Sequence, residues 1–518
     1  MTERSLKAAV GFGLLGSLLA MLSRSTVVDP DLFHELSLAR EIVTTGSIPR
    51  RDAFAYTPTV DPVVHHEWGT GLVLYGTAVS SGWGGSGLLA LKYLVGLGLG
   101  AGAVACARAR GASAATISFL APIALGLGWI GFGTVRAQLF TLLFAVLWLW
   151  LLTFDLRGRR WWVLVAPLLF LVWLNMHAGF VVGLGLLGLH AAEVLTRELG
   201  THRNWGRAGR RVAHLLAAGA IMLAILPVNP YGWDYLHYLW HALRMPRTLI
   251  GEWGSLWQQD SVGWPLLFAI SLAAVGCSLF RRGRGVGFGL SIVCVTAWLA
   301  MRHIRHLSLY AAIWLCLVPA WVDGTALGDA MNRVWRKLAG WLAAVWLVCG
   351  LLGVVHACQQ EFWRVRMPTS CAAAREGVPV YPAGVTAYLS EHAFQGNLMV
   401  PFEAGGFVSW ELYPAVKVSI DSRYEVAYPP GAVEESVAFY QAQPGWQETL
   451  DRYPTDAVLV PRWSRLADVL EQSREATLQD KWQRVYRDGA YLLFVRRGHT
   501  AGLPRVDRNG APIVASFP

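Results

Sequence analysis

Long apolar segments alternate with short polar ones from the N-terminus to about residue 357. The apolar segments centre near residues 15, 97, 122, 146, 168, 187, 220, 270, 293, 313 and 347. A helix needs about 20 mostly apolar residues to cross a bilayer. The pattern therefore predicts an α-helical polytopic membrane protein with about eleven spans. We expect a transmembrane domain over residues 1–357 and a soluble domain over residues 358–518.

The pattern after residue 375 is that of a small α/β domain. Short apolar runs predict buried strands at 398–402, 416–421 and 457–461. Helical patterns lie around 383–392, 432–452 and 464–478. The segment WQRVYRDGAYLLFVRR predicts a β-hairpin, with Asp488 and Gly489 in its turn.

The first long polar segment, residues 25–85, begins with an amphipathic helix over residues 30–44. Its apolar face holds Leu32, Phe33, Leu36, Ala39, Ile42 and Val43, and its polar face holds His34, Glu35, Ser37, Arg40 and Glu41. Asp29 is placed as its N-cap, Pro30 as its first residue, and Gly46 ends it. Such a helix is expected to lie in the membrane interface.

Composition agrees with a membrane protein, because 54% of the residues are hydrophobic and only 15% are charged. The N-terminus has the basic start and apolar middle of a signal peptide but no small-x-small cleavage site. We therefore expect it to be retained as the first span. The net charge of +10 does not indicate nucleic-acid binding, because no basic-aromatic stripe occurs in a soluble segment.

Basic residues cluster after alternate spans, which predicts the orientation of the chain. The clusters are Arg4 and Lys7; Arg108 and Arg110; Arg157, Arg159 and Arg160; Arg203, Arg207, Arg210 and Arg211; Arg281, Arg282 and Arg284; and Arg333, Arg336 and Lys337. The positive-inside rule assigns them to the cytoplasm. The N-terminus is then cytoplasmic and the soluble domain is extracytoplasmic.

Most of the chemically interesting residues fall on the outward loops. Asp29 and Asp31 lie where the first span ends, and a carboxylate there can act as general base for an acceptor hydroxyl or amine. The alternative is structural, because Asp29 can cap the helix and Asp31 suits the positive end of its dipole. Since capping explains Asp29 more easily, Asp31 is the better candidate for chemistry.

A second group, in and around the segment HHEW, could bind a metal or position a substrate. His66 and Glu67, together with Asp29 and Asp31, could hold a divalent metal ion. No tight ligand spacing supports this, so ordinary hydrogen bonding and positioning remain the alternative. His34 belongs to the same positioning group. A divalent metal is the only cofactor that the sequence raises.

Outward arginines form a third group. The segment RHIRH places Arg302, His303, Arg305 and His306 at the end of a span, and Arg136 and Gln138 begin another. Arginine binds phosphate bidentately, so a phosphate or pyrophosphate is a natural partner. For Arg136 the alternative is a side chain that reaches out of the membrane to water. His177 and Glu252 are further positioning candidates.

The seven cysteines show no metal-binding spacing. Cys358 and Cys371 fall in the outward part of the chain, where an oxidising compartment permits a disulfide. Free thiols are the default expectation for both.

Eight short motifs resemble those of a group of uncharacterised bacterial membrane proteins. They are Asp29-Pro-Asp31-Leu-Phe33-His34, Gly46-Ser-Ile48-Pro49 with Asp52, His66-Glu67-Trp68, Arg136-Ala137-Gln138, Asn175-Met-His177-Ala-Gly179, Asn229-Pro-Tyr-Gly232, Glu252-Trp253 and Arg302-His303. Phe33 and Ala137 depart from the pattern. An outward aspartate after the first span also resembles GT-C-type glycosyltransferases, which move a sugar from a polyprenyl-phosphate carrier to an acceptor.

This resemblance implies a role for each group. Asp31 or Asp29 would be the base, and Arg136, Arg302 and Arg305 would hold the carrier phosphate. The partners would be a polyprenyl-phosphate sugar and a glycan, lipid or protein acceptor. Two other hypotheses remain: a transporter or flippase of lipid-linked glycans, and a non-catalytic scaffold that presents the outer domain. A transporter should carry polar groups near the bilayer midplane, whereas here they cluster on one face.

Overall fold

The structure is a computed structural model. It describes all residues except 1, 134, 246, 248, 249, 260, 281–286, 473–479, 509–512, 514, 516 and 518. The chain forms two compact units. The first, here called the helical unit, comprises Met1–Thr26, Leu89–Gly232 and Pro246–Arg364. The second, the mixed unit, comprises Val27–Leu88, Trp233–Met245 and Val365–Pro518.

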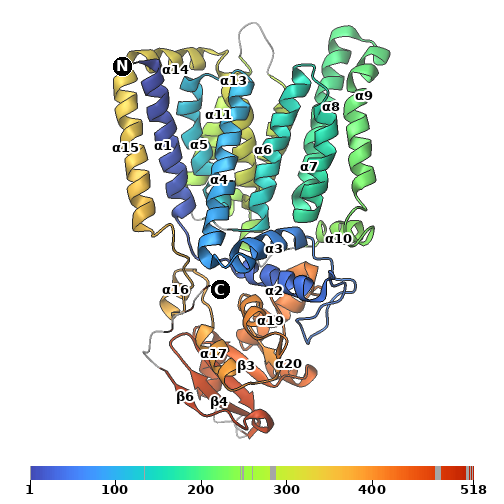
Figure 1. Ribbon diagram of the computed structural model, residues 1–518, viewed down its shortest axis with the longest axis vertical. Coiled ribbons are helices and arrows are strands. Elements are labelled where there is room, and N and C mark those ends of the chain that lie inside the picture. Colours follow the sequence, from blue (N-terminus) through green and yellow to red (C-terminus); the bar gives the residue numbers. More distant parts are fainter. Residues whose placement is uncertain are drawn as a thin grey trace. The chain divides into compact units, whose positions relative to one another are not determined.

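Each of the eleven predicted apolar segments lies in a helix (Figure 1). The helices are α1 (Glu3–Ser23), α4 (Gly84–Ala109), α5 (Ala114–Phe132), α6 (Ala137–Leu156), α7 (Trp162–Met176), α8 (Val181–His202), α9 (Trp205–Ile225), α11 (Gly263–Ser278), α12 (Leu290–Arg302), α13 (Leu307–Val322) and α15 (Ala339–Gln359). In the part of the chain that the structure describes, eight apolar helical segments are long enough to cross a membrane, and α7, α11 and α12 are shorter. The chain is a multi-pass membrane protein.

In the helical unit, one helix is central and one pair of helices packs especially closely. Every residue of α13 is buried, so this helix lies at the centre of the unit. Helices α1 and α15 approach closely through small residues: a Cβ on Gly16 would lie 2.5 Å from the Gly350 carbonyl oxygen. Close approach through glycines is typical of helix pairs in membranes, where dispersion forces replace the hydrophobic effect.

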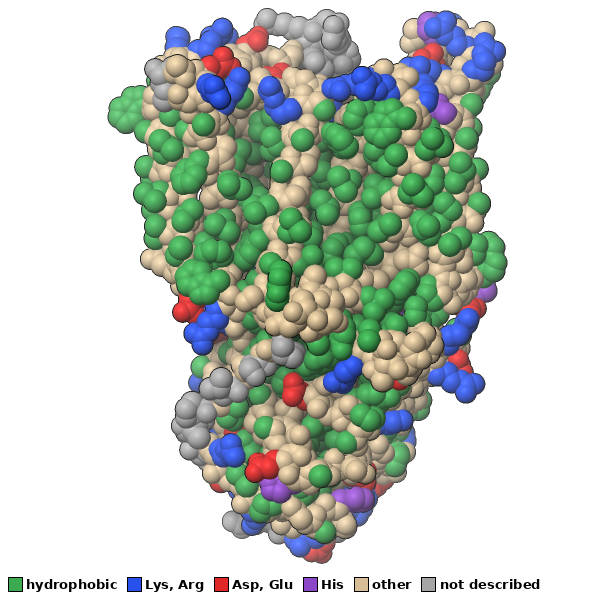
Figure 2. All heavy atoms as spheres, viewed as in Figure 1, with side chains coloured by type: hydrophobic (Ala, Val, Ile, Leu, Met, Phe, Trp, Pro, Cys, Tyr) green, Lys and Arg blue, Asp and Glu red, His purple; other side chains and the backbone are tan. Residues whose placement is uncertain are grey.

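Lys and Arg side chains gather at one end of these helices, where α14 (Ala326–Lys337) lies (Figure 2). Between the two ends, the visible surface of the helices shows hydrophobic side chains among backbone and other uncharged groups, and no Lys, Arg, Asp or Glu is seen there. This distribution is what the positive-inside rule predicts for a membrane domain. The predicted cluster Arg281, Arg282 and Arg284 lies outside the described residues.

The mixed unit contains the predicted sheet, in the strand order β2-β1-β3-β5-β4-β6. The strands are β1 (Gly396–Met399), β2 (Val416–Val418), β3 (Ala457–Pro461), β4 (Trp482–Arg487), β5 (Tyr491–Arg496) and β6 (Val506–Asp507). Strands β1, β2 and β3 are parallel, and β5 runs antiparallel to β3. The hairpin turn is confirmed, because Asp488 accepts hydrogen bonds from the backbone N–H groups of Ala490 and Tyr491.

The helices of this sheet domain are largely those expected. They are α17 (Ala383–Glu391), α19 (Ala432–Tyr440), α20 (Trp446–Arg452) and α21 (Arg465–Gln472). The helix expected over 432–452 is divided, because Gly445 adopts a positive φ of 88° before α20. The end of the helix expected over 464–478 lies outside the described residues. Helix α18 (Gly405–Leu412) was not predicted.

Within the mixed unit, the loop that follows α1 packs with the C-terminal residues. Its residues 54–56 run beside β2: Val418 donates to the Phe54 carbonyl oxygen, and Tyr56 donates to that of Val418, both at 3.0 Å. Helix α2 (Pro30–Thr45) is the predicted amphipathic helix, and it packs between α3 (Trp68–Tyr75) and α18.

Because α2 is covered on two sides, the prediction of one polar face is wrong in part: Glu35 and Ser37 are buried. Glycines permit the two close contacts. A Cβ on Gly71 would lie 2.8 Å from the Glu35 carbonyl oxygen, and one on Gly406 would lie 3.3 Å from the His34 nitrogen.

Cys358 and Cys371, the two cysteines for which a disulfide was possible, are both free thiols. The Sγ of Cys371 donates to the Gly489 carbonyl oxygen at 2.9 Å.

Candidate functional site

The start of α2 holds the two aspartates that the sequence singled out. The Oδ1 of Asp29 accepts a hydrogen bond from the Asp31 backbone N–H at 3.1 Å, and Pro30 is the first helical residue. Asp29 is 6% exposed, and Asp31 is half-buried. The predicted cap is therefore confirmed. It uses the carboxylate of Asp29 and leaves Asp31 as the stronger candidate for acid-base chemistry.

One turn further along α2, three acidic and imidazole side chains come together. His34, Glu35 and Glu67 each offer a ligating atom, and these atoms all lie within 4.8 Å of one another. Glu35 is only 3% exposed. Burial raises its pKa well above the usual range, and the Glu67 and Asp31 carboxylates raise it further. Two ionised carboxylates so close together are therefore unfavourable here, unless a proton or a cation is shared between them.

Next to this cluster lies an ionic group that sequence reasoning missed. Arg423 forms a bidentate pair with Asp421, at 2.7–3.0 Å, and also binds Asp52 of the first loop. Burial alone would raise the pKa of Asp52, but the charge of Arg423 outweighs it and lowers that pKa. The group joins the loop to the segment after β2.

A sequence signal for this group did exist. Asp421, Ser422 and Arg423 lie just beyond the end of β2, after Ser419 and Ile420, and side chains at the carboxyl ends of parallel strands often form sites. Ser422 places its Oγ 3.1 Å from the Nδ1 of His34. Gly405 permits the close approach of α18, because a Cβ there would lie 1.9 Å from the Ile420 carbonyl oxygen.

The two histidines of HHEW have different surroundings. His65 is buried, and burial together with the charge of Arg423 lowers its pKa to about 3. It is therefore neutral at physiological pH. His66 stacks obliquely on Tyr238, with 5.3 Å between ring centroids, and its Nδ1 lies 3.6 Å from Glu67. Among the described residues, the imidazole that lies within 4.8 Å of the ligating atoms of both Glu35 and Glu67 is that of His34. The pair of His66 and Glu67 stays a prediction.

In the helical unit, three of the predicted phosphate-binding residues, His303, Arg305 and His306, gather around Trp253. The guanidinium groups of Arg305 and Arg247 lie over its ring, at 4.6 and 4.4 Å from the centroid. The Nδ1 of His303 donates to the Trp253 carbonyl oxygen at 2.7 Å, and the ring of His306 lies 6.2 Å from that of Trp253. Sequence reasoning read Trp253 only as part of a motif, whereas it is the centre of this group.

Three more predicted residues, Arg136, Glu252 and Gln138, make contacts beside this group. Arg136 forms an ion pair with Glu252 at 3.0 Å, next to Trp253. Gln138 donates to the Arg305 carbonyl oxygen at 3.1 Å. Arg302 ends α12 and is exposed.

His177 has a structural role. Its Nδ1 accepts hydrogen bonds from the Thr141 hydroxyl at 2.7 Å and from the Gly179 N–H at 3.0 Å. These bonds fix the turn between α7 and α8.

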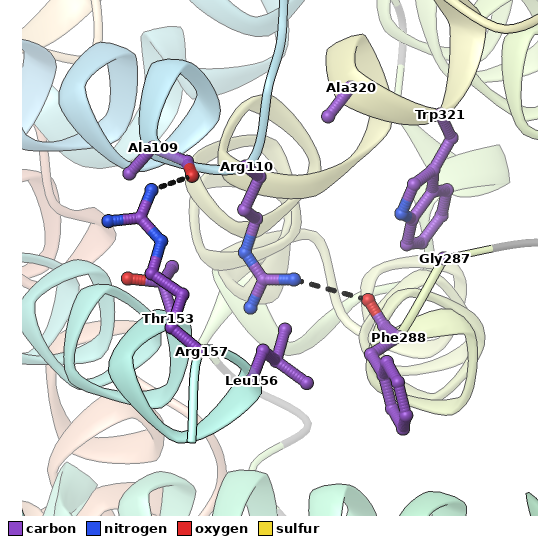
Figure 3. Close-up of a pocket in the computed structure, with 9 residues that line it drawn as sticks. All are labelled: Ala109, Arg110, Thr153, Leu156, Arg157, Gly287, Phe288, Ala320 and Trp321. Atoms are coloured by element: carbon purple, nitrogen blue, oxygen red, sulfur yellow. Dashed lines mark hydrogen bonds between the residues drawn. The ribbon is translucent and has the colours of Figure 1, made fainter. Parts of the chain in front are cut away.

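A cavity of about 260 Å³ in the helical unit holds none of these residues (Figure 3). Arg110 and Arg157 line it, and they donate to the carbonyl oxygens of Phe288 and Ala109. Arg157 ends α6, whereas Arg136 begins it, so the length of α6, roughly 30 Å at 1.5 Å per residue, separates this cavity from the Trp253 group.

Comparison with known proteins gave no match to any family model and none to any curated protein. Among solved structures, the chain is similar to ArnT from Cupriavidus metallidurans bound to undecaprenyl phosphate. The TM-score is 0.53 and the identity 15%, over 94% of this chain and 97% of that one. The archaeal oligosaccharyltransferase AglB from Archaeoglobus fulgidus, in complex with an inhibitory peptide and a dolichol-phosphate, gives a TM-score of 0.49 and 9% identity, over 88% and 69%. The likeness to ArnT shows that the chain shares the fold of that protein, in line with the resemblance of the first loop to GT-C-type glycosyltransferases.

Proposed function

We propose that the protein is a membrane glycosyltransferase that moves a sugar from a polyprenyl-phosphate donor to an acceptor. The observation that carries the proposal is the group of carboxylates at the start of α2, in a chain with the fold of ArnT. That structure is bound to undecaprenyl phosphate, a lipid phosphate of the donor class proposed here. The acceptor is a glycan, a lipid or a protein.

In the proposed reaction, Asp31 takes a proton from the acceptor hydroxyl or amine. The acceptor then attacks the anomeric carbon of the sugar, and the bond between that carbon and the phosphate oxygen breaks. The polyprenyl phosphate leaves with the bonding electron pair. Arginine is suited to binding its phosphate, and this is the role we assign to Arg136, Arg302 and Arg305.

The distribution of charge supports an orientation for this reaction. The basic end of the helical unit is the cytoplasmic end under the positive-inside rule. Arg136, Arg302 and Arg305 lie at the opposite ends of their helices from the basic clusters, since Arg136 begins α6 and Arg157 ends it. We therefore place the reaction on the extracytoplasmic face of a bacterial inner membrane, with the N-terminus in the cytoplasm.

The test is Asp31→Asn in the full-length protein, reconstituted into liposomes with a radiolabelled polyprenyl-phosphate sugar and a cell-envelope acceptor fraction. We expect transfer to fall by roughly 100-fold or more, because the general base is lost. The matched control is Glu41→Gln, the same change of an acid to its amide on the same helix. It should transfer like the wild type.

Asp29→Asn adds a second comparison, because asparagine caps a helix as well as aspartate does. Full activity in both aspartate variants would contradict acid-base catalysis by this helix. Movement of the labelled lipid across the bilayer without transfer would instead support a flippase.

A further inference from the structure

We propose that His34, Glu35 and Glu67 bind one divalent transition-metal cation, of the class of Mn²⁺ or Zn²⁺, which ties helix α2 to the start of α3. Their ligating atoms lie within 4.8 Å of one another. Two ligands of one ion are separated by at most about 4–5 Å, twice the metal–ligand distance. Small side-chain adjustments therefore suffice to close the three groups around an ion.

Glu35 provides an observation independent of this spacing. Its side chain is 97% buried, since only 3% of the residue is exposed. Its Oε2 has no hydrogen-bond partner among the described residues. A buried carboxylate oxygen without a donor is costly, and a cation would provide the missing partner.

The third ligand is already oriented for this task. The Nδ1 of His34 is engaged by the Oγ of Ser422 at 3.1 Å, so Nε2 is the ring nitrogen left for the ion. Metal-binding histidines usually hydrogen-bond through their second nitrogen, which fixes the ring and its tautomer. One imidazole with two carboxylates favours Mn²⁺ or Zn²⁺ over Ca²⁺, which prefers oxygen ligands alone.

The ion would act by position. Glu35 lies four residues after Asp31 on α2, so both side chains project from the same face of the helix. Glu67 precedes α3, which packs against α2. A cation shared by Glu35 and Glu67 would fix the turn of α2 that carries Asp31. The metal site itself goes beyond the proposed transfer reaction and does not depend on it.

The experiment measures metal bound by the tag-free, full-length protein in detergent, without donor or acceptor. The protein is treated with a chelator and then dialysed against MnCl₂ or, separately, ZnCl₂, and bound metal is counted by mass spectrometry. We expect the wild type to bind one equivalent more than Glu35→Gln and Glu67→Gln. Ser422→Ala should weaken binding by about 10-fold, because it frees the His34 ring.

Glu41→Gln, on the same helix but outside the cluster, should bind as the wild type does. Equal binding by the wild type, Glu35→Gln and Glu67→Gln for both metals would overturn the proposal. If either glutamine variant fails to fold, the test is the metal affinity of Ser422→Ala. A metal affinity equal to that of the wild type would then count against the site. Since no transfer is measured, the result is independent of the proposed function.

Discussion

Arg423 lies between Asp52 and Asp421, and each of the three side chains is about 1% exposed. Two carboxylates and one guanidinium leave a net negative charge in this buried group. Removal of one member destabilises the protein, because the remaining charges are then buried without a partner and without solvent. At the scale of single residues, this ionic group joins the first loop to the segment after β2.

Arg423→Met should therefore lower the free energy of unfolding by about 3–5 kcal/mol. Thermal melting of the detergent-solubilised protein measures the loss. Arg452→Met is the control, because Arg452 is exposed and its partner Glu435 is partly exposed, so this pair should contribute about 1 kcal/mol or less.

The same group predicts a pH dependence. The pKa of Asp52 is lower in the folded protein than its ordinary value of 3.8, so its contribution to stability is present above that value. This contribution is lost as the pH falls below about 4. In Arg423→Met, Asp52 and Asp421 have lost their cation. The melting temperature of this variant should therefore fall less than that of the wild type when the pH is lowered below about 4. An identical fall in melting temperature with pH in both proteins would contradict the assignment.

At the scale of elements, glycines set how closely α2 is packed. Gly71 of α3 and Gly406 of α18 face α2 from the two elements that cover it. The contact at Gly71 leaves no room for a Cβ and the contact at Gly406 leaves little. The position of His34 and Glu35 therefore depends on backbone approach as well as on their own bonds.

Gly71→Ala should lower stability by about 1–3 kcal/mol, because its Cβ would lie 2.8 Å from the Glu35 carbonyl oxygen. Gly76→Ala is the matched control a few residues on, since nothing lies within 4 Å of the Cβ it would add. It should be neutral or stabilising by up to about 1 kcal/mol. Thermal melting compares the two, and equal stability would show that α2 and α3 can separate without cost.

At the scale of the whole molecule, the asymmetry of charge predicts orientation. Basic side chains gather at one end of the helical unit, and such an asymmetry sets which loops stay in the cytoplasm.

In a cysteine-free background, a membrane-impermeant maleimide should label Ser390→Cys in spheroplasts. Arg159→Cys should react only after the membrane is permeabilised. Both positions are exposed in the structure, so access to each depends on the side of the membrane. Labelling of Arg159→Cys in intact spheroplasts would reverse the proposed orientation.

The sequence by itself determined the elements. Apolar runs of spanning length can only be helices in lipid, because every backbone polar group must be paired there, and so all eleven segments lie in helices. Short apolar runs predicted β1, β2 and β3, and the turn residues Asp488 and Gly489 predicted the hairpin of β4 and β5. The cap at Asp29 followed from its place before Pro30.

Only the tertiary structure decided which side chains meet. Glu35 reads as part of a solvated face until α3 and α18 cover α2 from both sides. Arg423 is 371 residues from Asp52, and Ser422 is 388 residues from His34. Local periodicity holds no information about partners so distant in the chain. Their pairing depends on the return of the chain through the sheet to the first loop, which the packing of β2 beside residues 54–56 brings about.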